Sequence, residues 1–417
     1  MEAVVGVIFI AILGVIIYAY AGYPAILSLC GIFRRKRVPP DDSYCPRVVL
    51  IISVNNEERI IREKIENSLK LDYPKDKLRI LVASDGSVDA TNDIVREYGN
   101  RNVVLKAFDR REGKSATLNG AVLGLEGDIL IFSDANAFYR EDAIRKLVRN
   151  LADDDVGCVV GRLVYLSNHS YVGKGESLYW RYESYLNNLE SKLKSVLVAT
   201  GTIFAVRREL FRPLIKDVAN DFQLPAEVAS RGFGVVYERD AIAYEKSTFF
   251  FREEFARKRR IIVRGLTGFR ALRGNFGGPF RVFQFISRKL IRWFVGPLLP
   301  ALYIANLLLI SHPVYLTLFV LQNAFYLLAA IGALLRRGGV QSRVLFIPFY
   351  FVMVNAASLA AIVNYICGDR LTSWEKAETT RDSHHAEHAP QLRVIEGNKE
   401  LSCVGKRKEI ENLERIT

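Results

Sequence analysis

The sequence predicts an α/β protein in which a mostly parallel, Rossmann-like sheet is flanked by membrane-spanning helices at both ends of the chain. Two observations predict this class. Between residues 48 and 150, short apolar runs alternate with amphipathic stretches of helical spacing. Near both ends of the 417-residue chain, long apolar segments occur that a soluble domain does not need. Alternating strands and helices favour a parallel sheet covered by helices on both faces.

The apolar segments are long enough to cross a bilayer. Residues 3–33 carry no charged side chain, and three further runs lie at 295–310, 314–335 and 344–367. About 20 apolar residues are needed to span the hydrocarbon core. The first run exceeds the core of a signal peptide and lacks a small-residue cleavage site, so we expect a retained anchor. The sequence therefore predicts a multi-pass membrane protein.

Basic segments beside the apolar runs predict the orientation. RRKR (34–37) follows the first run, and RRGGVQSR (336–343) separates the last two. Positive charge marks the cytoplasmic side, so we expect residues 38–290 in the cytoplasm, beneath the cell (plasma) membrane. One span before this block and three after it place the tail from Gly368 outside, unless one segment is re-entrant. Both arrangements stay open.

The net charge of +13 is concentrated in one region. Residues 252–292 hold twelve Lys and Arg against two Glu, which accounts for +10 of the total. Beside a membrane, such a region favours anionic lipid headgroups or diphosphates over nucleic acid. The five cysteines have no metal-ligand spacing, which fits a reducing compartment.

The first half of the cytoplasmic block contains four expected strands, each followed by an expected helix. VVLIISV (48–54) is a continuous β-branched run, typical of a strand buried on both faces. The next helix has Asn56 available as its cap. The other strands are expected at 78–84, 102–108 and 128–134, and the helices at 57–70, 85–98, 113–126 and 140–151.

Polar residues follow three of these strands. They are Asn55, Asn56 and Glu57 on the first strand, Asp85 on the second, and Asp134 and Asn136 on the fourth. Ligands of parallel α/β sheets bind at the carboxyl ends of the strands. We therefore expect these side chains to converge on one edge of the sheet.

After residue 150 the pattern changes. Strands are expected at 157–166 and 196–206, an aromatic-rich amphipathic stretch at 175–195, and a helix at 221–232 with Asp221 at its start. The segments 250–274 and 279–294 are basic, aromatic and amphipathic, as expected of helices in the membrane interface. The tail after residue 370 is polar.

Each candidate site residue also has a structural interpretation. Asp85 and Asp221 are both placed where aspartates form turns or helix caps. The carboxylates of Asp85 and Asp134, at two strand ends on one edge, repel each other unless a cation or a hydrogen-bond donor of a ligand lies between them. This favours a binding site around the two residues. Lys114 begins a helix and can reach a diphosphate, or it is a solvated lysine. A P-loop is excluded because Phe108 stands where glycine is required.

The order of seven segments followed by apolar spans resembles the family 2 glycosyltransferases. These segments are VVLIISVNNEE, ASDGSVDAT, GKSATLNG, IFSDAN, GTIFAVRREL, ANDFQLP…RGFG and RKRRI, and the resemblance covers residues 45–265. Members are membrane-bound, inverting enzymes with a GT-A fold and include the cellulose and hyaluronan synthases. The resemblance implies transfer from a nucleotide-linked sugar.

The resemblance also implies roles for single residues. Asp134 matches the first aspartate of the metal-binding DxD motif, with Asn136 in its third position, and the expected cofactor is Mg²⁺ or Mn²⁺. Asp221 matches the general base. The residues expected at the donor are Asn55, Glu57, Asp85, Lys114, Asp134 and Arg260, and those expected at the acceptor are Thr200, Gly201 and Thr202.

The sequence departs from the family pattern at four positions. Asn55 replaces the aromatic residue expected before Asn56, so base stacking must differ. Asn136 replaces a carboxylate with an amide, which ligates a cation through oxygen but adds no charge. Asn220 replaces the acidic neighbour of Asp221. Ile261 stands where QxxRW has tryptophan, which argues against a processive polymer synthase.

The predicted organisation follows from these observations. It comprises an N-terminal transmembrane helix (1–33), a GT-A domain (45–250), basic interface helices (251–292), a C-terminal transmembrane region (293–368) and a polar tail (369–417). The predicted function is transfer of a sugar from a UDP- or GDP-linked donor to a lipid-linked or polysaccharide acceptor, in contact with membrane lipids and without nucleic acid.

Two other functions are compatible with parts of the sequence. One is a membrane-tethered nucleotide-sugar binder or scaffold whose weakened DxD motif no longer catalyses. The other is a transporter, against which the absence of acidic and basic residues within the four apolar runs argues. The tail sequence HHAEH (384–388) is a weak metal-binding pattern.

Overall fold

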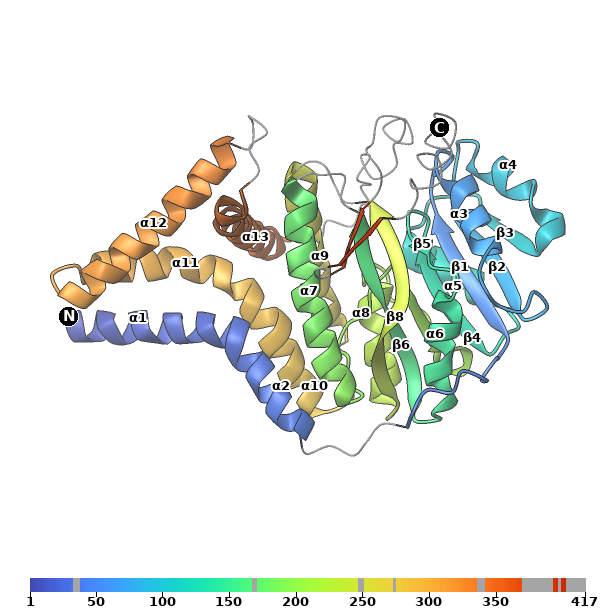
Figure 1. Cartoon of the computed structure of the whole chain (residues 1–417), viewed down its shortest axis with the longest axis horizontal. Coiled ribbons are helices and arrows are strands. Elements are labelled where there is room, and N and C mark those ends of the chain that lie inside the picture. Colours follow the sequence, from blue (N-terminus) through green and yellow to red (C-terminus); the bar gives the residue numbers. More distant parts are fainter. Residues whose placement is uncertain are drawn as a thin grey trace, which may run out of the picture.

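The protein combines an α/β unit with a helical arm (Figure 1). The computed structural model describes residues 1–32, 38–166, 171–246, 251–272, 275–335, 342–369, 393–396 and 399–402. The basic segments 34–37 and 336–341, on which the orientation rests, lie outside the described residues, as does HHAEH.

An eight-stranded sheet with the order β3-β2-β1-β4-β7-β6-β8-β5 forms the centre of the α/β unit. β1 pairs in parallel with β2 and β4, and β2 with β3, which confirms the expected parallel half. Beyond β4 the sheet is mixed: β7 is antiparallel to β4 and β6, whereas β6 and β8 are parallel. The strands are Val48–Val54 (β1), Leu78–Asp85 (β2), Val103–Phe108 (β3), Ile129–Asp134 (β4), Phe138–Tyr139 (β5), Val156–Leu166 (β6), Phe204–Arg207 (β7) and Gly234–Lys246 (β8).

Two expectations about the sheet were incomplete. The apolar run 196–206 is a strand only from Phe204 onward, and residues 200–203 form a turn closed by the Ile203 amide on the Thr200 carbonyl at 3.1 Å. The long strand Gly234–Lys246 was not expected. It carries Glu238, Arg239 and Asp240 in its middle, which interrupt the apolar pattern of a strand.

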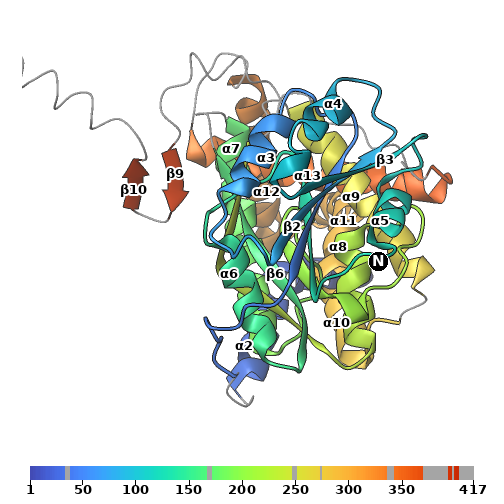
Figure 2. The ribbon, with the colours of Figure 1, turned by 90° about the vertical axis from the view of Figure 1, so that its right-hand side faces the viewer.

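Helices cover both faces of the sheet, as expected. One core layer joins β1, β2 and β4 to α3 and α6, and the opposite layer joins the other face of these strands to α5 and α8. Figure 2 shows α6 and α5 on opposite sides of the sheet. The helices of this unit are Ile61–Leu69 (α3), Thr91–Arg96 (α4), Lys114–Val122 (α5), Ala143–Val148 (α6), Tyr171–Lys192 (α7) and Asn220–Ser230 (α8).

Asn56 is not the cap of the first helix. α3 begins at Ile61, and the backbone carbonyl of Glu57 accepts from the amides of Ile60 and Ile61 at 3.1 and 2.9 Å. Asn56 has φ 51° and its Oδ1 accepts from the amide of Val88 at 2.8 Å. This hydrogen bond joins the loops after β1 and β2. The positive φ suits asparagine, which tolerates the left-handed region better than most residues.

In the part of the chain that the structure describes, four helical segments are long and apolar enough to cross a membrane. They are Glu2–Ile32, Pro279–Leu307, Pro313–Leu335 and Val344–Ile366. The first comprises α1 (Glu2–Ile17), a π-helical turn (Tyr18–Gly22) and α2 (Tyr23–Ile32). The second comprises α10 (Pro279–Phe285), a π-helical turn (Ile286–Leu290) and α11 (Ile291–Leu307). The remaining two are α12 (Pro313–Leu335) and α13 (Arg343–Ile366).

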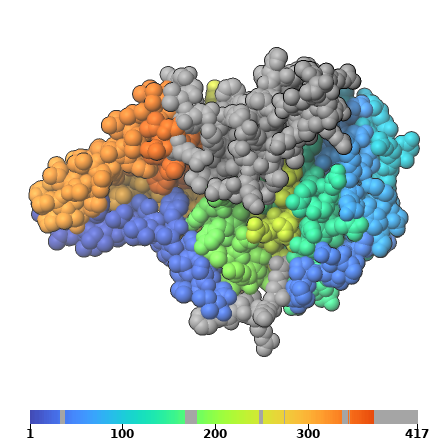
Figure 3. All heavy atoms as spheres, viewed as in Figure 1, coloured from blue at the N-terminus to red at the C-terminus, as the bar shows by residue number. Residues whose placement is uncertain are grey.

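These helices form the arm that projects from the α/β unit (Figure 3). Many of their large apolar side chains are exposed, including Val7 at 68%, Leu321 at 61% and Leu334 at 65%. A continuous apolar surface of this extent is stable in lipid rather than in water. The chain is therefore membrane-associated.

The basic segments differ from separate interface helices. The helix Pro279–Leu307 runs without a break across the boundary expected at residue 292. α9 (Phe251–Ala271) packs along α13, with Glu254 fully buried and accepting from the Tyr350 hydroxyl at 3.1 Å. The RKRR segment of α9 (257–260) is accordingly not fully solvated: Lys258 is 6% exposed and pairs with Glu254, and the three arginines are half-buried.

Candidate active site

A cavity of about 350 Å³ lies between the carboxyl edge of the sheet, α8, α9 and the membrane helices. It is lined by eight of the residues expected at the site, namely Lys114, Asp134, Asn136, Thr200, Gly201, Thr202, Asp221 and Arg260. It is also lined by Trp293 of α11 and by Asn355 and Ser358 of α13. One cavity thus connects the strand ends with the membrane helices.

Lys114 and Asp134, which both line this cavity, form an ion pair. The Lys114 ammonium group contacts Asp134 Oδ1. Lys114 is the first residue of α5, after Gly113 with φ 94°, and Asp134 ends β4. Because the lysine begins a helix, its charge adds to the partial positive charge of the helix N-terminus. An anion at this point would meet both.

A buried lysine supports the turn after Asp134. Lys64 of α3 is fully buried, and its Nζ donates to Ser133 Oγ at 2.8 Å and to the carbonyl of Ala137. It also lies 4.2 Å from the centre of the Tyr139 ring. Burial lowers the pKa of Lys64 to about 7, and the charge of nearby Asp134 opposes this shift. Lys64 therefore holds the turn that carries Asp134 and Asn136.

Asn136 is paired with a residue distant in sequence. Its Nδ2 donates to Glu245 Oε1 at 2.7 Å, and both side chains line the cavity. The pairing of β5 with β8, in which Phe138 opposes Tyr244, brings them together. The cavity therefore contains, besides Asp134 and Asp221, a third carboxylate that lies outside the sequence motif.

Asp85 is held by backbone amides of the loop before α5. Its Oδ1 accepts from Glu112 N at 2.8 Å and Gly113 N at 3.1 Å, and its Oδ2 accepts from Gly113 N at 3.0 Å. The side chain is 1% exposed. Gly86 permits this close approach, because a Cβ at this position would lie 2.6 Å from Arg111 N. Asp85 thus joins β2 to the start of α5.

Asn55, Glu57 and Asp85 do not line the cavity. Asn55 Nδ2 donates to the carbonyl of Asp85 at 2.7 Å, and Glu57 N donates to Thr91 Oγ1 at 2.7 Å. All three are nearly buried, between 1% and 3% exposed. They lie at the ends of β1 and β2, on the same edge of the sheet as Asp134. The structure places them beside the cavity rather than in it.

Asp221 faces the cavity from the first turn of α8. The residue before the helix is Ala219, so Asp221 is not the helix cap. A Cβ at Gly201 would lie 3.1 Å from Asp221 Oδ2, so glycine leaves room for the carboxylate. Among the described residues, this carboxylate accepts no hydrogen bond. Burial raises the pKa of Asp221, and the charges of Lys114 and Arg264 oppose the shift. It is available as a proton acceptor.

The turn Thr200–Thr202 forms the wall beside Asp221. The amide of Ala199 donates to the Asp221 carbonyl at 2.8 Å, which joins this wall to α8. The Tyr139 hydroxyl donates to the carbonyl of Thr202 at 2.9 Å. Thr202 Oγ1 is buried and has no hydrogen-bond partner among the described residues. It is a polar group that a bound hydroxyl would satisfy.

Arg260 lines the cavity from α9, together with Arg257 and Arg264. Arg257 Nη1 donates to the Tyr165 hydroxyl at 2.7 Å, and its Nε donates to Glu254 at 2.7 Å. Arg257 is thereby held by β6 and by its own helix. The cavity has a cationic wall on the side of α9.

Sequence reasoning missed Lys64, Glu245 and Arg264. Lys64 lies in an amphipathic helix, where a lysine is normally solvated. Glu245 is the penultimate residue of a strand that was not expected, so no signal placed it near Asn136. In the sequence, Arg264 was only one member of the basic run 252–292. Its spacing of four residues from Arg260 is the signal that could have placed both side chains on one face of a helix.

The oxygen ligands at Asp134 and Asn136 fit a hard divalent cation. Mg²⁺ and Mn²⁺ prefer carboxylate and carbonyl oxygens. Within the described part of the chain, no group of three or more His, Cys, Asp or Glu forms a complete metal cage. Mg²⁺ is commonly bound by one or two carboxylates plus substrate phosphates, so this pair fits a cation that arrives with a diphosphate.

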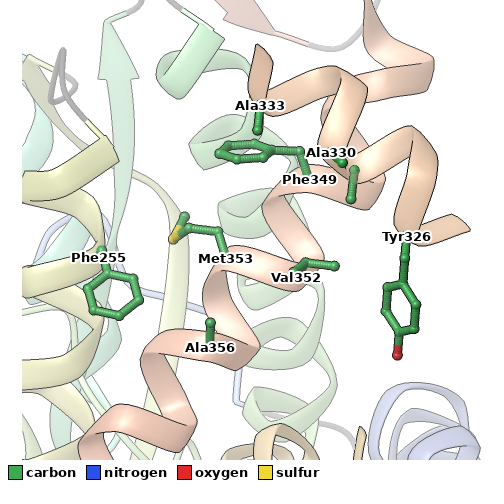
Figure 4. A pocket seen from close by; sticks show the side chains of 9 residues that line it. Phe255, Tyr326, Ala330, Ala333, Phe349, Val352, Met353 and Ala356 are labelled. Atoms are coloured by element: carbon green, nitrogen blue, oxygen red, sulfur yellow. The ribbon is translucent and has the colours of Figure 1, made fainter. Parts of the chain in front are cut away.

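A second cavity, of about 400 Å³, lies between α9, α12 and α13. Figure 4 shows Phe255, Phe349 and Met353 around it. Its lining is apolar except for the Tyr326 hydroxyl, which points away from the other labelled side chains in Figure 4. This composition suits hydrocarbon and not a nucleotide.

The mixed sheet, with its acidic strand ends and a helix N-terminus facing one cavity, has the architecture of the GT-A glycosyltransferase fold. Residues 49–215 match the model of glycosyl transferase family 2. This part of the chain is thus similar to family 2 glycosyltransferases, which agrees with the resemblance seen in the sequence.

Two relatives and one solved structure illustrate the relationship. The chain is 30% identical over 223 residues to probable glycosyltransferase YdaM of Bacillus subtilis, covering 48% of this chain and 51% of that protein. It is 30% identical over 118 residues to a beta-monoglucosyldiacylglycerol synthase of Synechocystis, covering 27% of this chain and 25% of the synthase. The matches thus span about half or less of these relatives.

The fold as a whole resembles mannosyltransferase PcManGT from Pyrobaculum calidifontis, whose structure is a complex with GDP-Man and Mn²⁺. The TM-score is 0.67 at 21% identity, and the match covers 88% of this chain and 98% of that one. This similarity includes the helices of the arm, because 88% of the chain exceeds the α/β unit alone. It establishes the GT-A fold with its flanking helices.

Proposed function

We propose that this protein is an inverting glycosyltransferase that moves a sugar from a nucleotide-linked donor to a lipid-linked acceptor at the membrane surface. One observation carries the proposal: a single cavity contains the carboxylate of Asp221, the Lys114–Asp134 pair and side chains of α11 and α13. In this proposal the cavity holds the donor next to the base Asp221 and beside the membrane helices. A polysaccharide acceptor is the second candidate, and the missing tryptophan after Arg260 speaks against a long polymer.

The reaction needs a base, and Asp221 is its candidate. The acceptor oxygen forms a bond to the anomeric carbon while the bond from that carbon to the diphosphate breaks, and Asp221 takes the hydroxyl proton. A carboxylate with a raised pKa is a better proton acceptor than an ordinary aspartate. Attack opposite the departing diphosphate inverts the configuration. The turn Thr200–Thr202 beside Asp221 is the proposed acceptor wall.

The departing diphosphate needs positive charge. Lys114 at the start of α5 and Arg260 on α9 line the cavity and are placed to neutralise it. A divalent cation held by Asp134 and Asn136 would supply further charge stabilisation. Asp85, Asn55 and Glu57, beside the cavity at the ends of β1 and β2, would position the nucleoside part of the donor.

The donor and cofactor are proposed from the comparison with PcManGT, whose complex contains GDP-Man and Mn²⁺. GDP-mannose with Mn²⁺ is accordingly the first combination to test, followed by UDP-linked sugars and Mg²⁺. The lipid acceptor is supported by the beta-monoglucosyldiacylglycerol synthase and by the contact of the cavity with membrane helices. We place the protein in the cell membrane as a multi-pass protein whose α/β unit is cytoplasmic.

The proposal is tested with purified protein in lipid nanodiscs and labelled GDP- and UDP-sugars. The wild type should transfer label to the lipid fraction, whereas Asp221→Asn should lose at least about a hundredfold in rate because it removes the base. Asp217→Asn, outside the cavity, is the matched control.

Donor binding is measured in parallel by thermal shift. Asp221→Asn should still be stabilised by the donor, because Asp221 acts on the acceptor. Full turnover by this variant would exclude Asp221 as the base. Binding without transfer or hydrolysis by the wild type would instead favour the tethered binder.

A further inference from the structure

The amide of Asn136 has a fixed orientation. A carboxylate only accepts hydrogen bonds, so the amide must present its NH₂ group to Glu245 Oε1, which lies 2.7 Å from Nδ2. Oδ1 of Asn136 then points away from Glu245, and no described residue donates to it. Asn136 is 8% exposed, so the surrounding side chains leave it little room to turn. The hydrogen bond to Glu245 thus fixes the direction in which the amide oxygen of Asn136 points, which is away from Glu245.

The orientation depends on the fold around Asn136. β5 begins two residues after Asn136 and pairs with β8, and Phe138 opposes Tyr244, next to Glu245. On the other side, Lys64 donates to the carbonyl of Ala137 and fixes the same turn. Asn136 is therefore held between two supports, and among the described residues Glu245 is the one that forms a hydrogen bond with its side chain.

The charge of the site also depends on Glu245. Asp134 is the only carboxylate of its turn, and Lys114 already contacts it. Without a further acid, this pair would be electrically neutral and would attract a divalent cation weakly. Glu245 lines the same cavity and returns one negative charge next to Asn136.

We infer that Glu245 takes the place of the acidic residue that position 136 lacks. It aims Asn136 Oδ1 at the cation and supplies the missing charge, so that Asp134, Asn136 and Glu245 together form the divalent-cation site. The inference rests on the proposed metal-dependent function, and it assigns part of the site to a strand 109 positions away from the motif. The alternative is that Glu245 only joins β5 to β8.

The test is Mn²⁺ binding, measured by electron paramagnetic resonance of free Mn²⁺ in the presence of GDP, with UDP as a second series. Glu245→Gln should weaken Mn²⁺ binding at least tenfold, because glutamine loses the charge and no longer dictates the orientation of the amide. Glu209→Gln, an exposed acid outside the cavity, is the matched control and should bind as the wild type does.

The decisive variant moves the charge. Asn136→Asp combined with Glu245→Gln returns the acid to position 136 and should restore Mn²⁺ affinity to within about threefold of the wild type. Asn136→Asp alone places two carboxylates at hydrogen-bond distance. It should therefore lower Tm without metal, and Mn²⁺ with GDP should recover it.

Three outcomes overturn the inference. Wild-type affinity in Glu245→Gln would show that Glu245 is structural. Failure of the double variant to regain affinity, with an unchanged Tm, would show that charge at this position is not what the cation requires. Absence of Mn²⁺ binding by the wild type, while GDP-mannose still raises Tm, would reject a metal site here but leave donor binding intact.

Discussion

Arg288 donates from Nη2 to Glu183 Oε2 at 2.7 Å, and Arg288 is only 1% exposed. Glu183 lies on α7 of the α/β unit, and Arg288 lies on the helix that continues into α11. Arg288 also pairs with Glu190, which accepts from the Tyr23 hydroxyl of α2 at 2.5 Å. A buried polar network therefore joins the α/β unit to two of the membrane helices.

Breaking this network should destabilise the whole protein. Glu183→Ala leaves Arg288 and Arg292 without one of their partners. Removing one partner of a buried ion pair costs about 3–5 kcal/mol, because the other charge stays buried. We expect a clear fall in Tm in detergent micelles, whereas Glu97→Gln, which breaks the exposed pair with Arg62, should leave Tm unchanged. Equal Tm values for both variants would contradict the role assigned to the network.

Removal of divalent cations should stop transfer. A chelator should abolish activity, and added Mn²⁺ or Mg²⁺ should restore it, because the departing diphosphate needs charge that Lys114 and Arg260 supply only in part. Asp134→Asn should lose at least about a hundredfold in rate in the presence of metal. Undiminished activity in chelator would show that Asp134 and Asn136 do not hold a cation during catalysis.

The pH–rate profile should report Asp221. A base must be ionised, and activity is lost as the pH falls through its pKa. Burial raises the pKa of Asp221, so the acid limb of kcat/KM should lie above the ordinary aspartate value of about 3.9.

Arg264 supplies the variant for this test. The positive charge of Arg264 lowers the pKa of Asp221, so Arg264→Gln should move the acid limb to higher pH. Arg270→Gln, an exposed cation on the same helix, should not move it. A limb that stays in place in Arg264→Gln, or moves equally in both variants, would argue that Asp221 is not the titrating base.

Lys64 should make stability depend on pH. Its pKa is lowered to about 7 in the folded protein, whereas an unfolded lysine keeps its proton to about pH 10.4. Between these values the unfolded chain binds more protons, so the contribution of Lys64 to stability rises with pH by about 1.4 kcal/mol per unit.

The measurement compares Tm of the wild type and Lys64→Met from pH 7 to pH 10. The difference between them should shift in favour of the wild type as the pH rises. Lys70→Met, at an exposed position just after α3, should track the wild type throughout. A constant difference between wild type and Lys64→Met would mean that Lys64 keeps its proton in the folded protein.

Local patterns predicted the parallel half of the sheet well. β1, β2, β3 and β4 appear within a residue or two of the predicted strands, because a strand buried on both faces is a continuous apolar run. The strand Gly234–Lys246 escaped prediction because charged residues interrupt its apolar pattern. The burial of Lys258 within RKRR on α9 also escaped prediction, since a basic run is normally solvated, and here Lys258 and Arg257 pair with the buried Glu254.

The candidate site was predictable in part for the same reason. Lys114 begins α5, Asp134 ends β4 and Asp221 lies in the first turn of α8. Parallel topology brings the carboxyl ends of strands and the starts of the following helices to one edge. Asp85 was expected on that edge. Its hydrogen bonds with the amides of Glu112 and Gly113 were not, because they depend on the path of the loop before α5, and no periodic pattern in the sequence predicts that path.

The amino-acid sequence by itself determined the class of fold, the four apolar segments and the carboxylates at the strand ends, because these follow from periodicity, length and position along the chain. Only the tertiary structure decided that Glu245 lies against Asn136 and that Arg288 joins α7 to the membrane helices. Those pairs are separated by 109 and 105 positions, and only strand pairing and helix packing bring them within hydrogen-bond distance.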